Sequence, residues 1–205
     1  KQGEKRLRDY FVRHIEIARA QNAGFVLESA SWRASPDWGD KLGLSRDQLS
    51  DLNRKSIALL SGLRDEFETP QSPMPISGNI GPRGDGYFPD QMMSGQQARD
   101  YHAFQTELFA DTEADLVSAF TMTHSGEAIG IARAAKDAGM PVVISFTTET
   151  DGRLPSGETL RQDTPALVVE KSREIPEENA VVVVKAGADT WYLHWELGSE
   201  LAKHA

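Results

Sequence analysis

The chain has 205 residues, of which 22 are basic and 31 acidic, and its formal net charge is −9 at pH 7. This length is sufficient for one domain with a sizeable core, and the acidic balance without a long basic run argues against nucleic acid or membrane surfaces as partners. Cysteine is absent, which excludes disulfides, thiolate catalysis and any thiolate metal site built by this chain alone. No apolar stretch approaches transmembrane length and the start shows no signal-peptide pattern, so we expect a cytoplasmic protein.

The first part of the chain alternates helical and strand patterns. Amphipathic spacing predicts a helix over residues 4–22, followed by a short buried strand over residues 24–29. Trp, Ser, Pro and Gly are frequent over residues 30–43, which predicts a loop. Ser45 and Gln48 have capping-box spacing, so the next helix begins there and runs to about Glu68. Its expected inward residues are Leu49, Leu52, Ile57, Leu60 and Leu63.

A glycine-rich loop follows the next predicted strand, residues 76–80. Residues 81–87 contain three glycines, which allow backbone amides to approach a ligand closely. The loop is a weak candidate for binding phosphate because no Lys-Ser/Thr pair follows it. Its Arg-Gly-Asp triplet is interpreted as part of the loop, not as an adhesion motif. A helix is predicted over residues 96–112.

Residues 114–157 give the strongest architectural signal. The apolar run Leu116 to Phe120 ends in polar residues, and an alanine-rich helical segment follows, stopped by Gly139 and Pro141. A second apolar run, Val142 to Phe146, also ends in polar residues. This strand, helix, strand pattern predicts a βαβ unit with parallel strands, and hence an α/β fold.

Ligands of such folds bind beyond the carboxyl ends of the strands. The polar residues at the predicted strand ends are therefore candidates for substrate binding: Glu28, Asn79, Thr121, Ser145, Thr147 and Glu149. Each has an alternative role, because residues at strand ends also fix loops through hydrogen bonds. Glu149 either binds the amino group of an amino-acid ligand or caps the loop over residues 150–157. No catalytic residue is assigned.

Histidines near this unit do not predict a metal site. His124 and Glu127 have the i,i+3 spacing of helical ligands, but two groups are too few to hold a metal. The preferred interpretation is a Ser125 N-cap with a solvated His124 beside it. His102 is expected to be packed or half-exposed in its helix.

The pattern changes after Gln162. Residues 166–170, 180–184 and 190–195 are strand-like but lack crossover helices, so antiparallel and parallel pairing both remain open. We therefore divide the chain into a barrel part, residues 1–162, and a divergent strand-rich segment, residues 163–205, that closes the same domain.

Several motifs occur in the order typical of one family. They are Leu-Glu-Ser-x-x-Trp-Arg-Ala-Ser-x-Asp-Trp-Gly (27–39), Gly-Asn-Ile-Gly-Pro-Arg-Gly-Asp-Gly-Tyr (78–87), Ala-Asp-Leu-Val-Ser-Ala-Phe-Thr (114–121), Glu-Ala-Ile-Gly-Ile-Ala (127–132) and Ser-Phe-Thr-x-Glu-Thr-Asp-Gly-Arg-Leu-Pro-Ser-Gly (145–157). Through them the segment from about Arg6 to Arg161 resembles the homocysteine S-methyltransferase family.

The resemblance implies a (β/α)8 TIM barrel that binds homocysteine at the top of its strands. It implies methyl transfer from a sulfonium or folate donor to the homocysteine thiol, and a role in methionine biosynthesis. In the family a zinc ion held by three cysteines lowers the pKa of the thiol. The family's Asn-Cys and Gly-Gly-Cys-Cys segments and its opening Asp-Gly-Gly turn are missing here, so we expect no zinc or other cofactor from this chain and no unaided methyl transfer.

Three functional hypotheses follow. The first is an S-methyltransferase-like protein with a small-molecule thiol or amino-acid ligand. The second is a non-catalytic, incomplete barrel or scaffold that associates with another chain, for instance as a homo-oligomer, because open sheet edges favour association. The third is a different small-molecule enzyme that uses Glu149 or Asp151 as a base.

Overall fold

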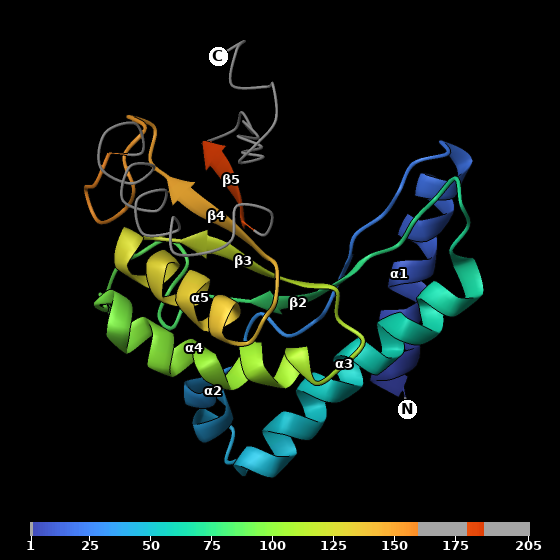
Figure 1. The fold of residues 1–205 in the computed structure, drawn as a ribbon, viewed down its shortest axis with the longest axis horizontal. Helices are drawn as coiled ribbons and strands as arrows, with labels where there is room; N and C mark the ends of the chain where they lie inside the picture. The colour runs from blue at the N-terminus through green and yellow to red at the C-terminus, as the bar shows by residue number, and fades with distance from the viewer. Residues whose placement is uncertain (1, 160–179, 187–205) are drawn as a thin grey trace.

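The protein is described here from a computed structural model that covers residues 2–159 and 180–186. Strands and helices alternate along most of the chain (Figure 1). The elements are α1 (Gln2–Ala20), β1 (Leu27–Glu28), α2 (Pro36–Lys41), α3 (Arg46–Phe67), β2 (Ile76–Ile80), α4 (Gly95–Ala110), β3 (Leu116–Met122), α5 (Ser125–Asp137), β4 (Val142–Thr148) and β5 (Ala180–Ala186).

The strands form one parallel sheet in the order β1-β2-β3-β4-β5, the same as their order in the sequence. Helices between the strands cover one face, with α4 and α5 packed side by side against it (Figure 1). This confirms the predicted α/β class and the parallel βαβ unit. The described strands form an open, curved sheet, not a closed ring.

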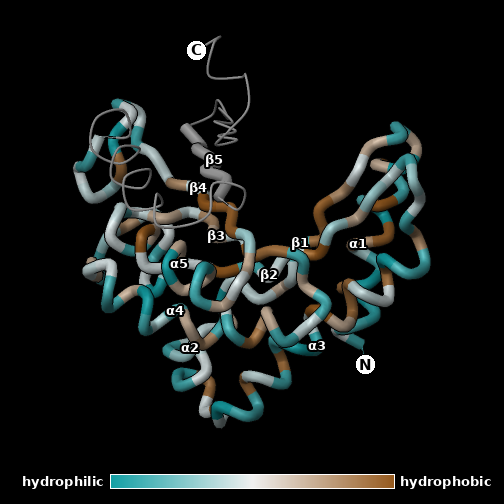
Figure 2. The backbone as a smooth tube through the Cα atoms, in the orientation of Figure 1, coloured by the Kyte–Doolittle hydropathy of each residue, from teal (hydrophilic) through white to brown (hydrophobic). Residues whose placement is uncertain are grey.

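The core lies between the sheet and its helices. Every second strand residue points toward the helices, so Leu27, Ile76, Val117 and Ile144 share this face and are at most 2% exposed. The hydrophobic colour in Figure 2 follows the strands, whereas the outer turns of α3 and α4 are largely hydrophilic. Phe109 of α4 packs so closely on the sheet that a Cβ at Gly78 would lie 2.3 Å from its ring.

The predicted start of α3 is confirmed. The Ser45 and Gln48 capping box is present at α3, and Ser94 with Gln97 forms a second one at α4. The loop predicted over residues 30–43 is wrong in part. Residues 36–41 form the short helix α2 inside the predicted loop, because Pro36 at its first position favours a helix start.

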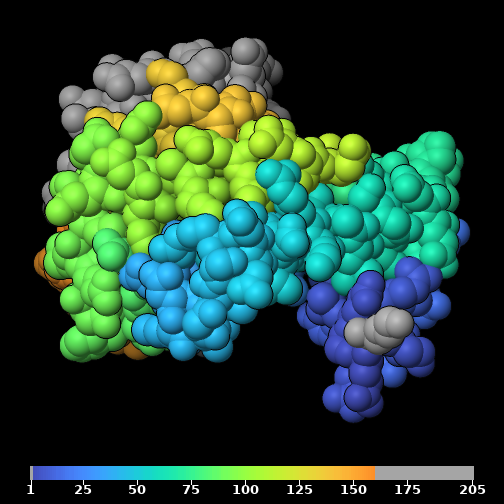
Figure 3. Space-filling model, turned by 90° about the horizontal axis from the view of Figure 1, so that it is seen from below, coloured from blue at the N-terminus to red at the C-terminus, as the bar shows by residue number. Residues whose placement is uncertain are grey.

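Leu52, expected to face inward, is 49% exposed. It lines a groove of about 780 Å³ between α1 and α3. From below, a hollow separates α1 (dark blue) from the lighter blue region of α2 (Figure 3).

The strand predicted at residues 180–184 is present as β5 and pairs with β4 in parallel. The antiparallel alternative is therefore wrong for this strand, while the strands predicted at residues 166–170 and 190–195 lie outside the described residues. Among the described helices, none combines the length and hydropathy needed to cross a membrane.

Candidate functional site

The sheet face opposite the helices carries polar side chains at the carboxyl ends of the strands. Glu28 pairs in register with Ser77, and Asn79 pairs with Ser118. Register partners in a parallel sheet point to the same side, as do residues two apart along a strand. The group that shares this side, called here the polar face, consists of Glu28, Ser77, Asn79, Ser118, Ser145 and Thr147.

The Glu28 carboxylate is held by one oxygen only. The Ser77 hydroxyl donates to Ser118 Oγ at 2.7 Å, and the Ser118 hydroxyl donates to Glu28 Oε1 at 2.9 Å. Glu28 Oε2 is buried and has no hydrogen-bond partner among the described residues. Burial raises the pKa of Glu28, and the hydrogen bond from Ser118 partly offsets this effect. A strong acceptor is therefore left on the polar face.

Asn79 supplies a second acceptor beside the first. Its backbone is fixed on both sides, since its N–H donates to Ser29 Oγ at 2.8 Å and its carbonyl accepts from Ser31 Oγ at 2.8 Å. Its side-chain Oδ1 is buried and has no partner within the described part of the chain. Because Ser118 bonds to Glu28 and pairs in register with Asn79, both residues that carry an unpaired acceptor are neighbours of the same serine.

Thr121 occupies a strained turn at the end of β3. Its φ of 62° lies in the left-handed region, which a β-branched residue rarely adopts. The register between β3 and β4 shifts at this point. The Thr121 N–H donates to Ser145 Oγ at 3.4 Å, and its hydroxyl donates to the Phe120 carbonyl at 2.6 Å. Backbone strain of this kind clusters at functional sites.

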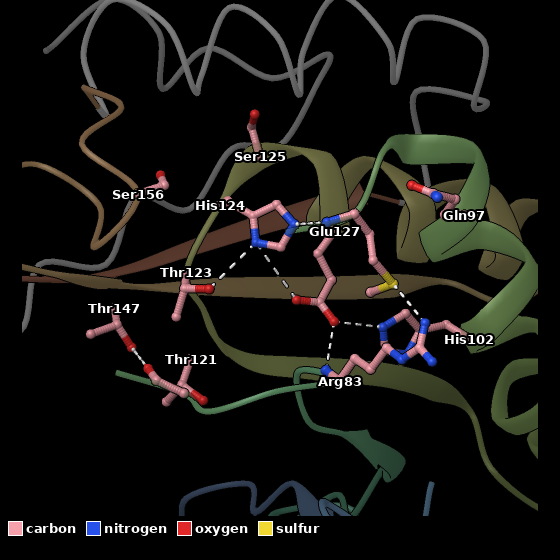
Figure 4. A network of polar contacts seen from close by, with 12 residues as sticks. Arg83, Gln97, His102, Thr121, Thr123, His124, Ser125, Glu127, Thr147 and Ser156 are labelled. Atoms are coloured by element: carbon pink, nitrogen blue, oxygen red, sulfur yellow. Dashed lines mark hydrogen bonds and ion pairs between the residues drawn. The ribbon is translucent and has the colours of Figure 1, made fainter. Parts of the chain in front are cut away.

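The glycine-rich loop crosses the ends of three strands. It leaves β2 at Gly81, where a side chain would collide with the Trp32 carbonyl, and reaches β3 at Gly86, where a Cβ would lie 2.7 Å from Thr121 Oγ1. The Gly86 carbonyl then accepts a hydrogen bond of 2.7 Å from Thr147 on β4 (Figure 4). The glycines therefore allow the backbone of this loop to lie close to the rim of the polar face.

Glu149 lies one residue beyond the end of β4. It is exposed and begins a turn after β4 that its backbone closes, since its N–H donates to the Arg153 carbonyl and its carbonyl accepts from the Gly152 N–H. Thus Glu28, Asn79, Ser145 and Thr147 share the polar face, and Thr121 stands at its edge.

Sequence reasoning missed Ser77 and Ser118, because serines within apolar strands gave no signal of their own. It was also wrong about His124, which is 2% exposed and is itself the N-cap residue of α5, while Ser125 begins the helix. Its Nε2 accepts the Met93 N–H at 3.0 Å, which satisfies this nitrogen in the buried ring. His102 is packed, as expected, at 1% exposure.

The residues do not fit the family's three-cysteine zinc site. The whole sequence lacks Cys. Within residues 2–159 and 180–186, no three His, Asp or Glu side chains are grouped as metal ligands. The polar face therefore provides hydroxyl, amide and carboxylate groups, and no thiolate.

A parallel sheet with helices on one face places the protein in the α/β class, and its polar groups lie at the strand ends, where ligands bind in many such folds. Residues 9–183 match the family model of homocysteine S-methyltransferase, and the chain belongs to this family. A comparison with curated proteins finds no significant match.

Three crystal structures of the homocysteine methyltransferase MmuM from Escherichia coli share the fold. The oxidized form has a TM-score of 0.66 at 18% identity, covering 91% of this chain and 76% of its own. The metallated form has a TM-score of 0.65 at 19% identity, covering 87% and 73%. The apo form has a TM-score of 0.63 at 23% identity, covering 86% and 61%. At these identities the likeness concerns the fold alone.

Proposed function

We propose that the polar face binds the amino-acid substrate of an S-methyl-transfer reaction, homocysteine or a related amino-acid thiol. The observation that carries this proposal is the pair of buried, unpartnered acceptors, Glu28 Oε2 and Asn79 Oδ1. Buried acceptors are costly unless a donor reaches them. An α-ammonium group supplies three N–H donors and a charge opposite to that of Glu28, so it satisfies both acceptors.

Binding the substrate does not by itself ionise its thiol. A free thiol has a pKa of about 8.5 and is mostly protonated at neutral pH. This chain offers no cysteine with which to hold a thiol-activating zinc ion. We therefore propose that it supplies the substrate-binding part of the family's chemistry and that the metal-stripped chain does not methylate homocysteine from a sulfonium donor. If mass spectrometry detects methylated homocysteine after incubation with the metal-stripped chain and a sulfonium donor, the proposed lack of methyl transfer is wrong.

Isothermal titration with two ligands tests the binding proposal. L-Homocysteine should bind at least about ten times more tightly than 4-mercaptobutyrate, which has the same thiol and carboxylate but lacks the ammonium group. Glu28→Gln should remove most of this difference, because the charge that pairs with the ammonium is gone. Glu107→Gln is the matched control, since Glu107 is exposed on α4.

Equal affinities for the two ligands would contradict the assignment of the acceptors. If neither ligand binds and the protein sediments as a tight dimer, the scaffold hypothesis is favoured instead.

A further inference from the structure

A buried polar cluster lies beside the strand ends, outside the polar face. It consists of Glu127 and His124 at the start of α5 and His102 on α4, each at most 2% exposed. A carboxylate in the first turn of a helix can stabilise that helix from an exposed position. Burying it is costly unless it is fully hydrogen-bonded, so the partners of Glu127 indicate what it does.

The hydrogen-bond partners in the cluster indicate which ring nitrogens of its two histidines carry a proton (Figure 4). Glu127 Oε1 accepts the Arg83 backbone N–H at 2.6 Å and lies 2.9 Å from His102 Nε2, which therefore carries a proton. His124 Nε2 accepts the Met93 N–H at 3.0 Å and is therefore unprotonated. Its Nδ1 lies 3.9 Å from Glu127 Oε2 and 3.4 Å from Thr123 Oγ1.

Two of these bonds hold the two ends of one loop. Arg83 and Met93 delimit residues 83–93, called here the arch, which connects β2 to α4. The first end is bound by Glu127 and the second by His124. Both ends are thus fixed to the start of α5, directly behind the end of β3.

Between its ends the arch reaches the polar face. Gly86 lies against Thr121, and its carbonyl accepts from Thr147. Around Gly86 the chain makes a tight turn, because the Asp85 carboxylate accepts the N–H groups of Tyr87 and Phe88, at 2.8 and 3.2 Å. The two aromatic side chains at this turn are each 70% exposed.

We propose that Glu127 is a positioning residue that holds the arch over the polar face, so that the arch covers a ligand bound at Glu28 and Asn79. The proposal rests on the proposed function for the identity of that ligand. Glu127 does not touch the ligand and acts through the backbone of Arg83. A preformed cover lowers the entropic cost of binding, because the loop need not be ordered when the ligand arrives.

Glu127→Ala and Glu127→Gln separate positioning from packing. Alanine removes the acceptor, so homocysteine affinity should fall at least about tenfold, and chymotrypsin should cut after Tyr87 at least about ten times faster. Glutamine retains an oxygen that accepts both N–H groups, so both readouts should stay within about threefold of the wild type. Both variants remove the charge. If the loss of charge alone caused the effect, Glu127→Gln would behave like Glu127→Ala.

Ser72→Ala is the matched control for lost stability. Ser72 is 2% exposed and donates to the Ala23 carbonyl, and it precedes β2 at the opposite end of the sheet. Its loss should lower the Tm without changing homocysteine affinity or cleavage at Tyr87. If Glu127→Ala changes these readouts no more than Ser72→Ala does, the positioning role is wrong.

Gly86→Ala keeps the test informative if Glu127→Ala does not fold. The added Cβ would lie 2.7 Å from Thr121 Oγ1 and push the arch off the strand end while the cluster stays intact. Affinity should again fall at least about tenfold, and unchanged affinity would contradict the proposal. If the wild type does not bind homocysteine, the proposed function fails, and proteolysis alone decides: faster cleavage in Glu127→Ala supports the anchored arch, and unchanged cleavage overturns it.

Discussion

The two faces of the sheet are built from alternate residues of the same strands and serve opposite purposes. On the helix side, Leu27, Ile76 and Val117 are fully buried and packed against apolar side chains. On the other side, their neighbours Glu28 and Ser77 bring a carboxylate and a hydroxyl to the strand ends. The first face gains stability from burial, whereas the second holds acceptors that no described residue satisfies. Packed apolar groups and unsatisfied acceptors are thus separated within single strands.

Substitutions on the helix side should have the largest effect on stability. Phe109→Ala should lower the free energy of unfolding by about 4 kcal/mol, because the ring is fully buried against Gly78 and its loss leaves a cavity. Urea unfolding followed by circular dichroism measures the change. Phe88→Ala removes a ring that is 70% exposed and should change the same quantity by less than about 0.5 kcal/mol. Similar losses for the two variants would mean that Phe109 is not part of the core.

On the polar face, removing a charge should stabilise the fold. Burial raises the pKa of Glu28, so the folded state favours the protonated form. Glu28 therefore contributes most to stability below its unfolded pKa of about 4.3, and this contribution is lost as the pH rises through the folded value. At pH 7 the buried carboxyl group therefore lowers the free energy of unfolding, and Glu28→Gln should raise it by about 1 kcal/mol.

The pH dependence of the free energy of unfolding distinguishes the removal of a buried charge from a gain in stability with another cause. Urea unfolding should show the advantage of Glu28→Gln at pH 7 and a smaller one at pH 4. Glu107→Gln, at an exposed site, should show no such trend. An advantage that grows toward low pH would reverse the sign and rule out a raised pKa for Glu28.

Local patterns in the sequence were enough to place the strands and most helices. Alternating and continuous apolar runs marked β2, β3 and β4, and capping-box spacing marked the start of α3. The same patterns placed Asn79 and Thr147 at strand ends, where the structure has them. Glu149 begins the turn after β4, which backbone bonds to Arg153 and Gly152 close, and its choice between ligand binding and loop capping stays a prediction.

The cluster at Glu127 could not be read from local patterns. Glu127 is 44 residues from Arg83 and 25 from His102, and only the packing of α5 against α4 and the arch brings them together. Helical spacing connected His124 with Glu127, but a polar pair at the start of a helix resembles a solvated cap. Burial distinguishes the two cases, and burial is a property of the tertiary structure.

The smallest predicted effect concerns the strained edge of the polar face. Two described residues other than glycine have positive φ, Asn22 at 52° and Thr121 at 62°. Asn22 follows the end of α1, where asparagine tolerates this conformation, but Thr121 is β-branched. Thr121→Gly should relieve strain of roughly 1–2 kcal/mol and lose about 1 kcal/mol to backbone entropy, leaving a net gain of about 0.5 kcal/mol.

The control for Thr121→Gly is Thr123→Gly, which changes a buried threonine without positive φ and should destabilise the protein. Urea unfolding gives the sign of each change. If the strain at Thr121 serves the rim of the polar face, homocysteine affinity should fall in Thr121→Gly while stability rises. A variant that gains stability and keeps full affinity would show that the strained turn belongs to the sheet and not to the site.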